Sequence, residues 1–260
     1  MRRFVKSARS VRQVLVRSDL LTPQAWLAEK PLQADERLYL IVSAASDAEA
    51  LKTLYQNEPM TQATPIWGGT PYAGWQQVMP YLVELKPTSG FLQWIAETDA
   101  RDWGWLAVSS STPEVVFEHL RSLTQVRMPD GTEVFFRFWD GRHILPILEG
   151  LGDAAGEVLP VFDRYLINGK RLEVGPRVVP PAKDWPWWEV PKTLLDGLAK
   201  KNPSTLIGNL MQWLEEERPD IYAAYPESNL KLKIARFVGR PDAPQNLNEV
   251  LLNHLILEQG

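Results

Sequence analysis

The sequence contains no cysteine, only three histidines and no long apolar run. The absence of cysteine excludes disulfide bonds, thiolate metal sites and cysteine nucleophiles. The histidines, His119, His143 and His254, are scattered along the chain, which argues against a histidine-rich metal site. The longest apolar stretch, LYLIVSAA at residues 38–45, has only the length of a strand, whereas about 20 residues are needed to span a bilayer.

A net positive charge is also lacking. The 260 residues carry a formal net charge of −4, whereas general nucleic-acid binding usually requires a strongly basic face. The chain is 45% hydrophobic and 23% charged, as in an ordinary globular protein. A chain of this length can bury a sizeable core, in one large domain or in two unequal ones.

Residues 1–30 are predicted to form a basic N-terminal extension. Residues 1–18 carry six basic side chains and no acidic one, and apolar residues recur at helical spacing (Phe4, Ala8, Val11 and Leu15). No continuous apolar stretch follows the charges, as a secretory signal would require, so a cytoplasmic location is the default. A transit peptide, a membrane-surface helix and a polyanion contact stay open. We favour an extension that docks on its own protein or stays mobile.

Residues 31–180 show the alternation of strands and helices that is typical of an α/β fold. Three apolar, partly β-branched stretches are each followed by a helix signal, such as the capping pattern of Ser46 and Glu49 or the N-cap and proline of Thr112-Pro113. The strands are expected at 38–45, 79–85 and 103–110, and the helices after Ser46, over 89–98 and from Pro113. We therefore predict an α/β lobe with a mixed sheet and flanking helices.

Residues 181–260 are predicted to form a smaller all-α lobe. The preceding segment, residues 176–191, is rich in proline and tryptophan and has the composition of a linker. Beyond it, helices are expected from Asn202-Pro203, from Ser228 and from Asn246. Each carries an apolar stripe, which we expect to form core.

Two hairpins are predicted, with Asp130-Gly131 and Asn168-Gly169 as their turns. The first leads into EVFFRFWDGRHILPIL, residues 133–148. In a strand, Phe135, Arg137 and Trp139 would share one face, and both faces would be apolar, so Arg137 is expected to be buried inside the sheet.

A buried guanidinium is costly unless it is paired, but an arginine can stack on aromatic rings and still bind a carboxylate. Asp140 follows at the expected strand end and is predicted to cap the next helix or to pair with an arginine. Pro146 is compatible with that helix only in its first turn. We therefore interpret Arg137, Asp140 and Arg142 as structural, and expect the loss of Arg137 or Asp140 to destabilise the α/β lobe.

Eleven tryptophans are an unusual number for this length, and they cluster. Trp103 and Trp105 lie along an expected strand and are predicted to be core. Trp185, Trp187 and Trp188 are different because prolines flank them on both sides. They either join the two lobes or face a partner, and they are the candidate partner-binding residues.

Catalytic motifs are missing from the sequence. The glycine-rich segment WGGTPYAGW, residues 67–75, lacks the Gly-Lys-Ser/Thr ending of a phosphate loop. Ser109-Ser110-Ser111 lacks the G-x-S-x-G context of a nucleophile elbow. No carboxylate pair stands out as an acid/base couple. We therefore predict no catalytic, cofactor-binding or metal-binding residues.

The chain resembles the type VI secretion effector chaperones, adaptors that share one domain long classed as of unknown function. The resemblance rests on the order of LYLIVSAA, GGTPYAGWQQVMPYLVEL and WGWLAVSSSTPEVVFEHLRSLTQVRMPDGTEVFFRFWDGRHILPIL. The R-F/Y-x-D-P-R motif of the family is similar to residues 137–142, with Gly141 in place of proline, a change expected to loosen the helix start but keep both charges. The similarity covers roughly residues 38–150, and the helical tail resembles the family's variable second lobe only weakly.

The resemblance implies a non-enzymatic, cytoplasmic adaptor of Gram-negative bacteria. It would bind a toxic effector protein encoded nearby and load it onto the VgrG-type spike protein. We expect no cofactor, no nucleic-acid partner and no stable membrane association. Two alternatives stay open: a carbohydrate-active enzyme with a tryptophan-lined cleft, and a membrane- or nucleic-acid-associated protein that binds through the basic N-terminus.

Overall fold

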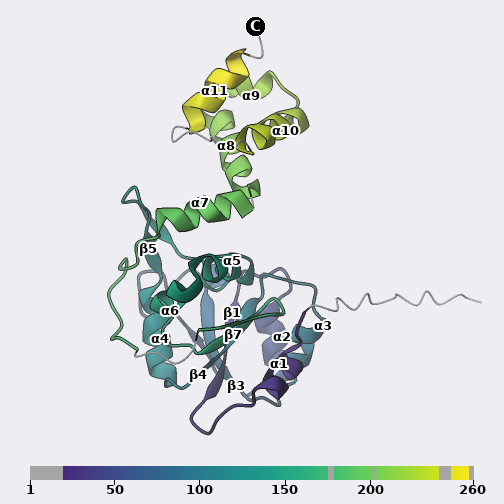
Figure 1. Ribbon diagram of the computed structural model, residues 1–260. Helices are drawn as coiled ribbons and strands as arrows, with labels where there is room; N and C mark the ends of the chain where they lie inside the picture. The colour runs from purple at the N-terminus through teal and green to yellow at the C-terminus, as the bar shows by residue number, and fades with distance from the viewer. Residues whose placement is uncertain (1–19, 175–178, 202, 240–246, 258–260) are drawn as a thin grey trace, which may run out of the picture.

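The computed structural model describes residues 20–174, 179–201, 203–239 and 247–257 (Figure 1). An α/β region with a six-stranded sheet is followed by an all-helical region, which confirms the predicted fold class. Most of the predicted basic extension, residues 1–19, lies outside the described residues. Among the described helices, none is both long and apolar enough to cross a membrane.

The α/β region contains all the strands of the described residues. Its six-stranded sheet comprises β1 (Arg37–Ser43), β2 (Ala63–Pro65), β3 (Pro80–Leu85), β4 (Gly104–Ser109), β7 (Arg164–Ile167) and β8 (Lys170–Glu173). A separate hairpin comprises β5 (Gln125–Arg127) and β6 (Glu133–Phe135). The helices are α1 (Pro23–Glu29), α2 (Ala50–Asn57), α3 (Phe91–Glu97), α4 (Pro113–Ser122), α5 (Gly141–Leu151) and α6 (Ala155–Val158), with short 3₁₀ helices η1 (Gln76–Val78) and η2 (Gly152–Ala154).

The sheet has the strand order β2-β3-β1-β4-β7-β8, and all its pairings are antiparallel. The expected mixed pairing is therefore wrong, although the alternation of strands and helices was predicted correctly. Helix α3 does join two strands that run in the same direction, β3 and β4. However, β1 lies between them and runs the opposite way. The sequence indicates the helix that connects β3 to β4. It does not indicate that β1 lies between these two strands.

Both faces of the sheet are covered at its centre, which explains why β1 and β4 are buried along almost their whole length. Alternate residues of β1 point to opposite sides. Tyr39 and Ile41 pack with Trp105 and residues of α4 and α5, whereas Leu38, Leu40 and Val42 pack with residues of α1, α2 and α3. Trp105 and Trp103 are both buried, as predicted from the sequence.

The β5–β6 hairpin forms at the predicted Asp-Gly turn, but it is a sheet of its own. The strand β6 ends at Phe135, and Arg137 lies beyond it. On its other side, β5 is held by residues 188–190, since the N–H of Arg127 donates to the carbonyl of Trp188 and the N–H of Val190 donates to that of Arg127. The expectation of Arg137 inside a continuous internal strand is therefore wrong.

One predicted helix cap and the expected place of one proline differ from the structure. Helix α2 begins at Ala50 after Glu49, which has a left-handed conformation and provides no side-chain cap. The Ser46 hydroxyl instead accepts from the N–H of Ala48. Pro146 lies inside α5, beyond its first turn, rather than within that turn.

The helical region comprises α7 (Lys192–Lys201), α8 (Ser204–Glu217), α9 (Pro219–Ala223), α10 (Glu227–Val238) and α11 (Leu247–Leu257). Figure 1 shows α8 to α11 at the end of the molecule away from the sheet, with α7 in between. The predicted apolar stripes of α8, α10 and α11 form a separate core, although Val250 is exposed. Leu194 of α7 instead belongs to the core of the sheet. The domain divisions near residues 30 and 180 stay a prediction.

Candidate functional site: the Asp140 cluster

Asp140 lies where the chain leaves β6 and enters α5. The segment between them is anchored by buried aromatic rings, because Phe138 and Trp139 point into the core of the sheet. The indole N–H of Trp105 in β4 also donates to the carbonyl of Phe138 at 2.7 Å. Asp140 is then the N-cap of α5, and its carboxylate accepts from the N–H of Arg142 at 2.9 Å. The predicted capping role of Asp140 is confirmed.

Gly141 brings the start of α5 against the sheet. A Cβ at this position would lie 2.9 Å from the carbonyl oxygen of Gly104 and 3.1 Å from that of Arg101. Gly104 is itself crowded, since its own Cβ would lie 2.0 Å from the carbonyl oxygen of Ile41, and its φ is +140°. The two glycines let three backbone segments approach closely. Gly141, which departs from the family's proline, therefore fits a tight contact at the helix start.

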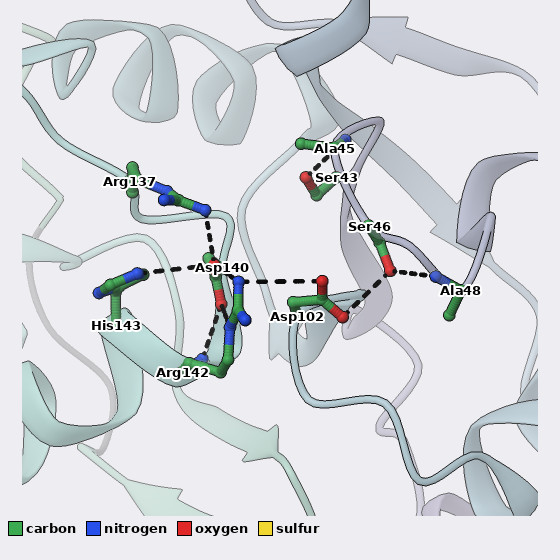
Figure 2. Close-up of polar contacts among 9 residues, drawn as sticks. All are labelled: Ser43, Ala45, Ser46, Ala48, Asp102, Arg137, Asp140, Arg142 and His143. Atoms are coloured by element: carbon green, nitrogen blue, oxygen red, sulfur yellow. Dashed lines mark hydrogen bonds and ion pairs between the residues drawn. The ribbon is translucent and has the colours of Figure 1, made fainter. Parts of the chain in front are cut away.

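Three cationic or polar side chains surround the Asp140 carboxylate (Figure 2). Arg142 donates from Nε to Oδ1 at 3.1 Å and from Nη2 to Oδ2 at 2.8 Å, which makes the pair bidentate. Arg137 donates from Nη2 to Oδ2 at 2.9 Å. His143 lies farther away, with Nε2 at 3.7 Å from Oδ2. The sequence motif therefore forms one cluster, as the pairing of Arg137 with Asp140 led us to expect.

The cluster extends to the sheet through Asp102, a residue that the sequence analysis missed. Nη2 of Arg142 lies 3.8 Å from Oδ2 of Asp102, and the Ser46 hydroxyl donates to Oδ1 of Asp102 at 3.2 Å. Ser46 follows β1 and Asp102 precedes β4. The contacts thus connect the start of α5 to the ends of two sheet strands. Only the position of Asp102 just before a strand hints at such a role.

Asp140 is buried, whereas the two arginines that bind it are half exposed. The Asp140 side chain is 2% exposed, whereas those of Arg137 and Arg142 are 49% and 51% exposed. The predicted burial of Arg137 is wrong, because β6 has ended before it and the chain turns away from the ladder. Its interpretation as a structural residue stays a prediction.

The electrostatics keep Asp140 ionised. Burial raises the pKa of its carboxyl, but the side-chain and backbone hydrogen bonds from Arg142, with the charges of His143 and Arg142, outweigh burial and hold this pKa below its ordinary value. Burial lowers the pKa of His143, and although Asp140 opposes this, Arg137 and Arg142 act with burial. A carboxylate of low pKa that is saturated by arginines is a poor proton acceptor, so the cluster is suited to holding structure and charge rather than to acid/base chemistry.

In the part of the chain that the structure describes, the arginine that is buried in the core is Arg164 in β7. Its side chain is fully buried and stacks on Trp26, with Cζ 5.3 Å from the ring centroid. It donates to the carbonyl of Lys30 and lies 3.4 Å from Oε2 of Glu36. The combination of guanidinium, aromatic ring and carboxylate that the sequence analysis assigned to Arg137 thus occurs here. Trp26 is distant in sequence, so no local pattern indicates it.

The three candidate partner-binding tryptophans lie in different environments. Trp188 is buried and packs on Phe136, with ring centroids 5.2 Å apart. Trp187 is half-buried, and its indole N–H donates to the hydroxyl of Ser122 at 3.0 Å. Trp185 is also half-buried. Trp188 therefore packs in the core beside β5, and partner binding by the other two stays a prediction.

The segment at residues 67–75 also contributes an aromatic cluster that was missed. Trp67 is buried and contacts Trp139 at a centroid distance of 5.1 Å, while Trp75 packs on Phe135 and is exposed. Arg121 fixes this segment through hydrogen bonds to the carbonyls of Ile66 and Gly68. The segment thus contributes Trp67 to the core beside β6. Among the described residues, no group of three or more His, Asp or Glu side chains is placed to hold a metal ion.

Comparisons with known proteins place the cluster inside a recognised domain. Residues 38–155 match the family model of DUF4123, a domain of unknown function, and this segment contains every residue of the cluster. The matched segment contains the motifs, spread over roughly residues 38–150, that carry the resemblance drawn from the sequence. Over 109 residues, the chain is 30% identical to accessory protein VasW of Vibrio cholerae serotype O1, an alignment that covers 42% of this chain and 36% of VasW. The chain therefore spans about a third of the length of this curated relative. No solved structure matches the chain.

Proposed function

We propose that the protein is a non-enzymatic adaptor of the type VI secretion system, because residues 38–155 match the DUF4123 family model. It binds an effector protein in the cytoplasm and loads this cargo onto the VgrG-type spike. The observation that carries the proposal is the domain match, which spans the Arg137–Asp140–Arg142 motif by which the chain resembles effector chaperones. The similarity to a protein called accessory protein VasW also supports an accessory role.

The environment of the motif supports a binding protein better than an enzyme. The carboxylate of Asp140 is engaged by two arginines and a backbone N–H. Six of the eleven tryptophans are buried in the core, whereas the carbohydrate-active alternative needs tryptophans along an open cleft. Those six are Trp26, Trp67, Trp103, Trp105, Trp139 and Trp188.

Co-expression tests the proposal directly. The tagged protein is produced together with the effector encoded beside it, and in parallel with the spike protein or with an unrelated effector as the control. We expect the neighbouring effector to co-purify as a stable complex and the unrelated effector to be lost. If neither the neighbouring effector nor the spike is retained, the adaptor function is wrong.

A further inference from the structure

We infer that Arg137 and Arg142 form a docking surface for an acidic segment of the protein partner, and that Asp140 is the buried anchor that orients them. This inference rests on the proposed adaptor function and specifies the chemistry of one contact. The partner chemistry follows from the way in which charge is distributed across the surface at this cluster.

The anions of the cluster lie inside and the cations lie outside. Asp140 is 2% exposed and Asp102 is 16% exposed, whereas both arginines are about half exposed. Although the formal charges of these four residues cancel, the solvent-facing part is made of guanidinium groups. An approaching molecule therefore meets positive charge at Arg137, and at Arg142 positive charge that the exposed Asp47 partly offsets, on a chain whose net charge is −4.

Elsewhere in the described chain, the ion pairs of partly exposed arginines present both signs to solvent. Arg171 pairs with Glu29, which is itself 49% exposed, and Arg218 pairs with Asp220, which is 60% exposed. At such surface pairs the carboxylate repels an incoming acid. Among the ion pairs of the described residues, only at Asp140 do half-exposed arginines share a carboxylate that is almost completely buried.

The two guanidinium groups also retain free donors. Within the described part of the chain, Arg137 donates only from Nη2, so that its Nε and Nη1 have no protein acceptor. Arg142 uses Nε and Nη2, and its Nη1 is likewise without a protein acceptor. Arginines bind carboxylates through such planar sets of N–H groups. Because Asp140 already holds both side chains in place, less side-chain entropy is lost when a partner docks.

Arg137→Ala tests the inference, since Asp140 keeps its three hydrogen bonds from Arg142 in this variant. The matched control is Arg171→Ala, which removes the same charge and a similar exposed ion pair elsewhere in the α/β region. We expect Arg137→Ala to raise the Kd for the neighbouring effector or the spike by about tenfold or more, and Arg171→Ala to raise it by less than about threefold. Both variants should melt within a few degrees of the wild type.

A salt series adds a second readout. The affinity of the wild type is expected to fall with increasing salt more steeply than that of Arg137→Ala, because the variant has lost one charge contact. Arg137→Lys retains the charge but loses the planar fork, and we expect intermediate affinity. If the wild type binds its partner and Arg137→Ala binds equally tightly with an unchanged salt dependence, the docking surface is wrong while the adaptor function stands.

A peptide titration without the effector tests the docking surface independently of the adaptor function. The protein is titrated at low salt with a hexaglutamate peptide, and with hexalysine as the control, while the Nε–H signals of its arginines are followed by NMR. Hexaglutamate is expected to shift the signals of Arg137 and Arg142 more than that of Arg171. Equal shifts at all three arginines would overturn the inference even if no effector complex is obtained.

Discussion

Arg142 binds Asp140 through its backbone and its side chain at the same time. Its N–H donates to Oδ1 at 2.9 Å, Nε donates to the same oxygen at 3.1 Å, and Nη2 donates to Oδ2 at 2.8 Å. One residue therefore provides both the N-cap hydrogen bond and the bidentate ion pair. Since Arg137 adds a single hydrogen bond, the stability of the cluster depends mainly on the pair of Asp140 and Arg142.

Asp140→Ala is expected to lower the free energy of unfolding by about 2–4 kcal/mol, because α5 loses its cap and two arginines lose their carboxylate. Arg137→Ala is expected to lower it by less than about 1 kcal/mol, as for an exposed ion pair. Asp140→Asn should fall between them, since its oxygen can still accept from the N–H of Arg142. Urea unfolding measures all three. If Arg137→Ala and Asp140→Ala lowered the free energy of unfolding equally, the result would support the prediction from the sequence that Arg137 is a structural residue.

Gly104→Ala is expected to lower the free energy of unfolding by more than about 3 kcal/mol or to prevent folding. Its Cβ would lie 2.0 Å from a carbonyl oxygen of the neighbouring strand β1, and φ is +140°. Gly208→Ala is the matched control, because this exposed glycine of α8 has no atom within 4 Å of the added Cβ. The control should stabilise the helix by up to about 1 kcal/mol. A well-folded Gly104→Ala variant with a wild-type melting temperature would contradict the close approach.

Stability is expected to fall as the pH is lowered from about 7 to 5, in part because of His119. Burial lowers the pKa of this histidine, although its hydrogen bond to the carbonyl of Val158 acts in the opposite direction. The unfolded chain therefore binds more protons than the folded one below the ordinary pKa of about 6.5. The contribution is complete above that pKa and is lost as the pH falls toward the folded pKa, at no more than about 1.4 kcal/mol per pH unit.

His119→Gln isolates this contribution, because glutamine can still donate to Val158 but does not titrate. Urea unfolding at pH 7.5, 6.5 and 5.5 should give a shallower pH dependence for the variant than for the wild type. Asp140 does not contribute in this range, since its pKa is lowered and its contribution is lost only at more acidic pH. Parallel pH profiles for the two proteins would show that His119 is not the source.

We expect Trp188 to stabilise the core and Trp187 to contact the partner. Trp188→Ala should lower the free energy of unfolding by about 3–5 kcal/mol, because the ring is buried against Phe136. Trp187 is only half-buried, and Lys183 lies over its ring at 4.9 Å from the centroid. We expect Trp187→Ala to weaken partner binding more than it lowers the melting temperature. The reverse result would assign Trp187 to the core as well.

Local patterns in the sequence were sufficient for the three central strands and for both hairpin turns. The apolar, β-branched stretches became β1, β3 and β4, and the Asp-Gly and Asn-Gly pairs became hairpin turns. These predictions succeed because hydrophobic periodicity and turn chemistry act over a few neighbouring residues. The capping role of Asp140 belongs to the same group, since an N-cap bonds only to the first turn of its own helix.

Tertiary structure alone decided which charged group is covered. In the sequence, Arg137 lies among aromatic residues, which predicts that it is buried. In the structure, β6 ends at Phe135 and Arg137 is half exposed, whereas Asp140 is buried. Among the described residues, the buried arginine is Arg164, whose partners Trp26 and Glu36 lie more than 120 residues earlier in the chain. The antiparallel pairing of the sheet also depends on distant contacts, because β1 lies between β3 and β4, which both follow it in the chain. Burial and strand pairing depend on contacts between distant segments, and a pattern that repeats every two to four residues contains no information about them.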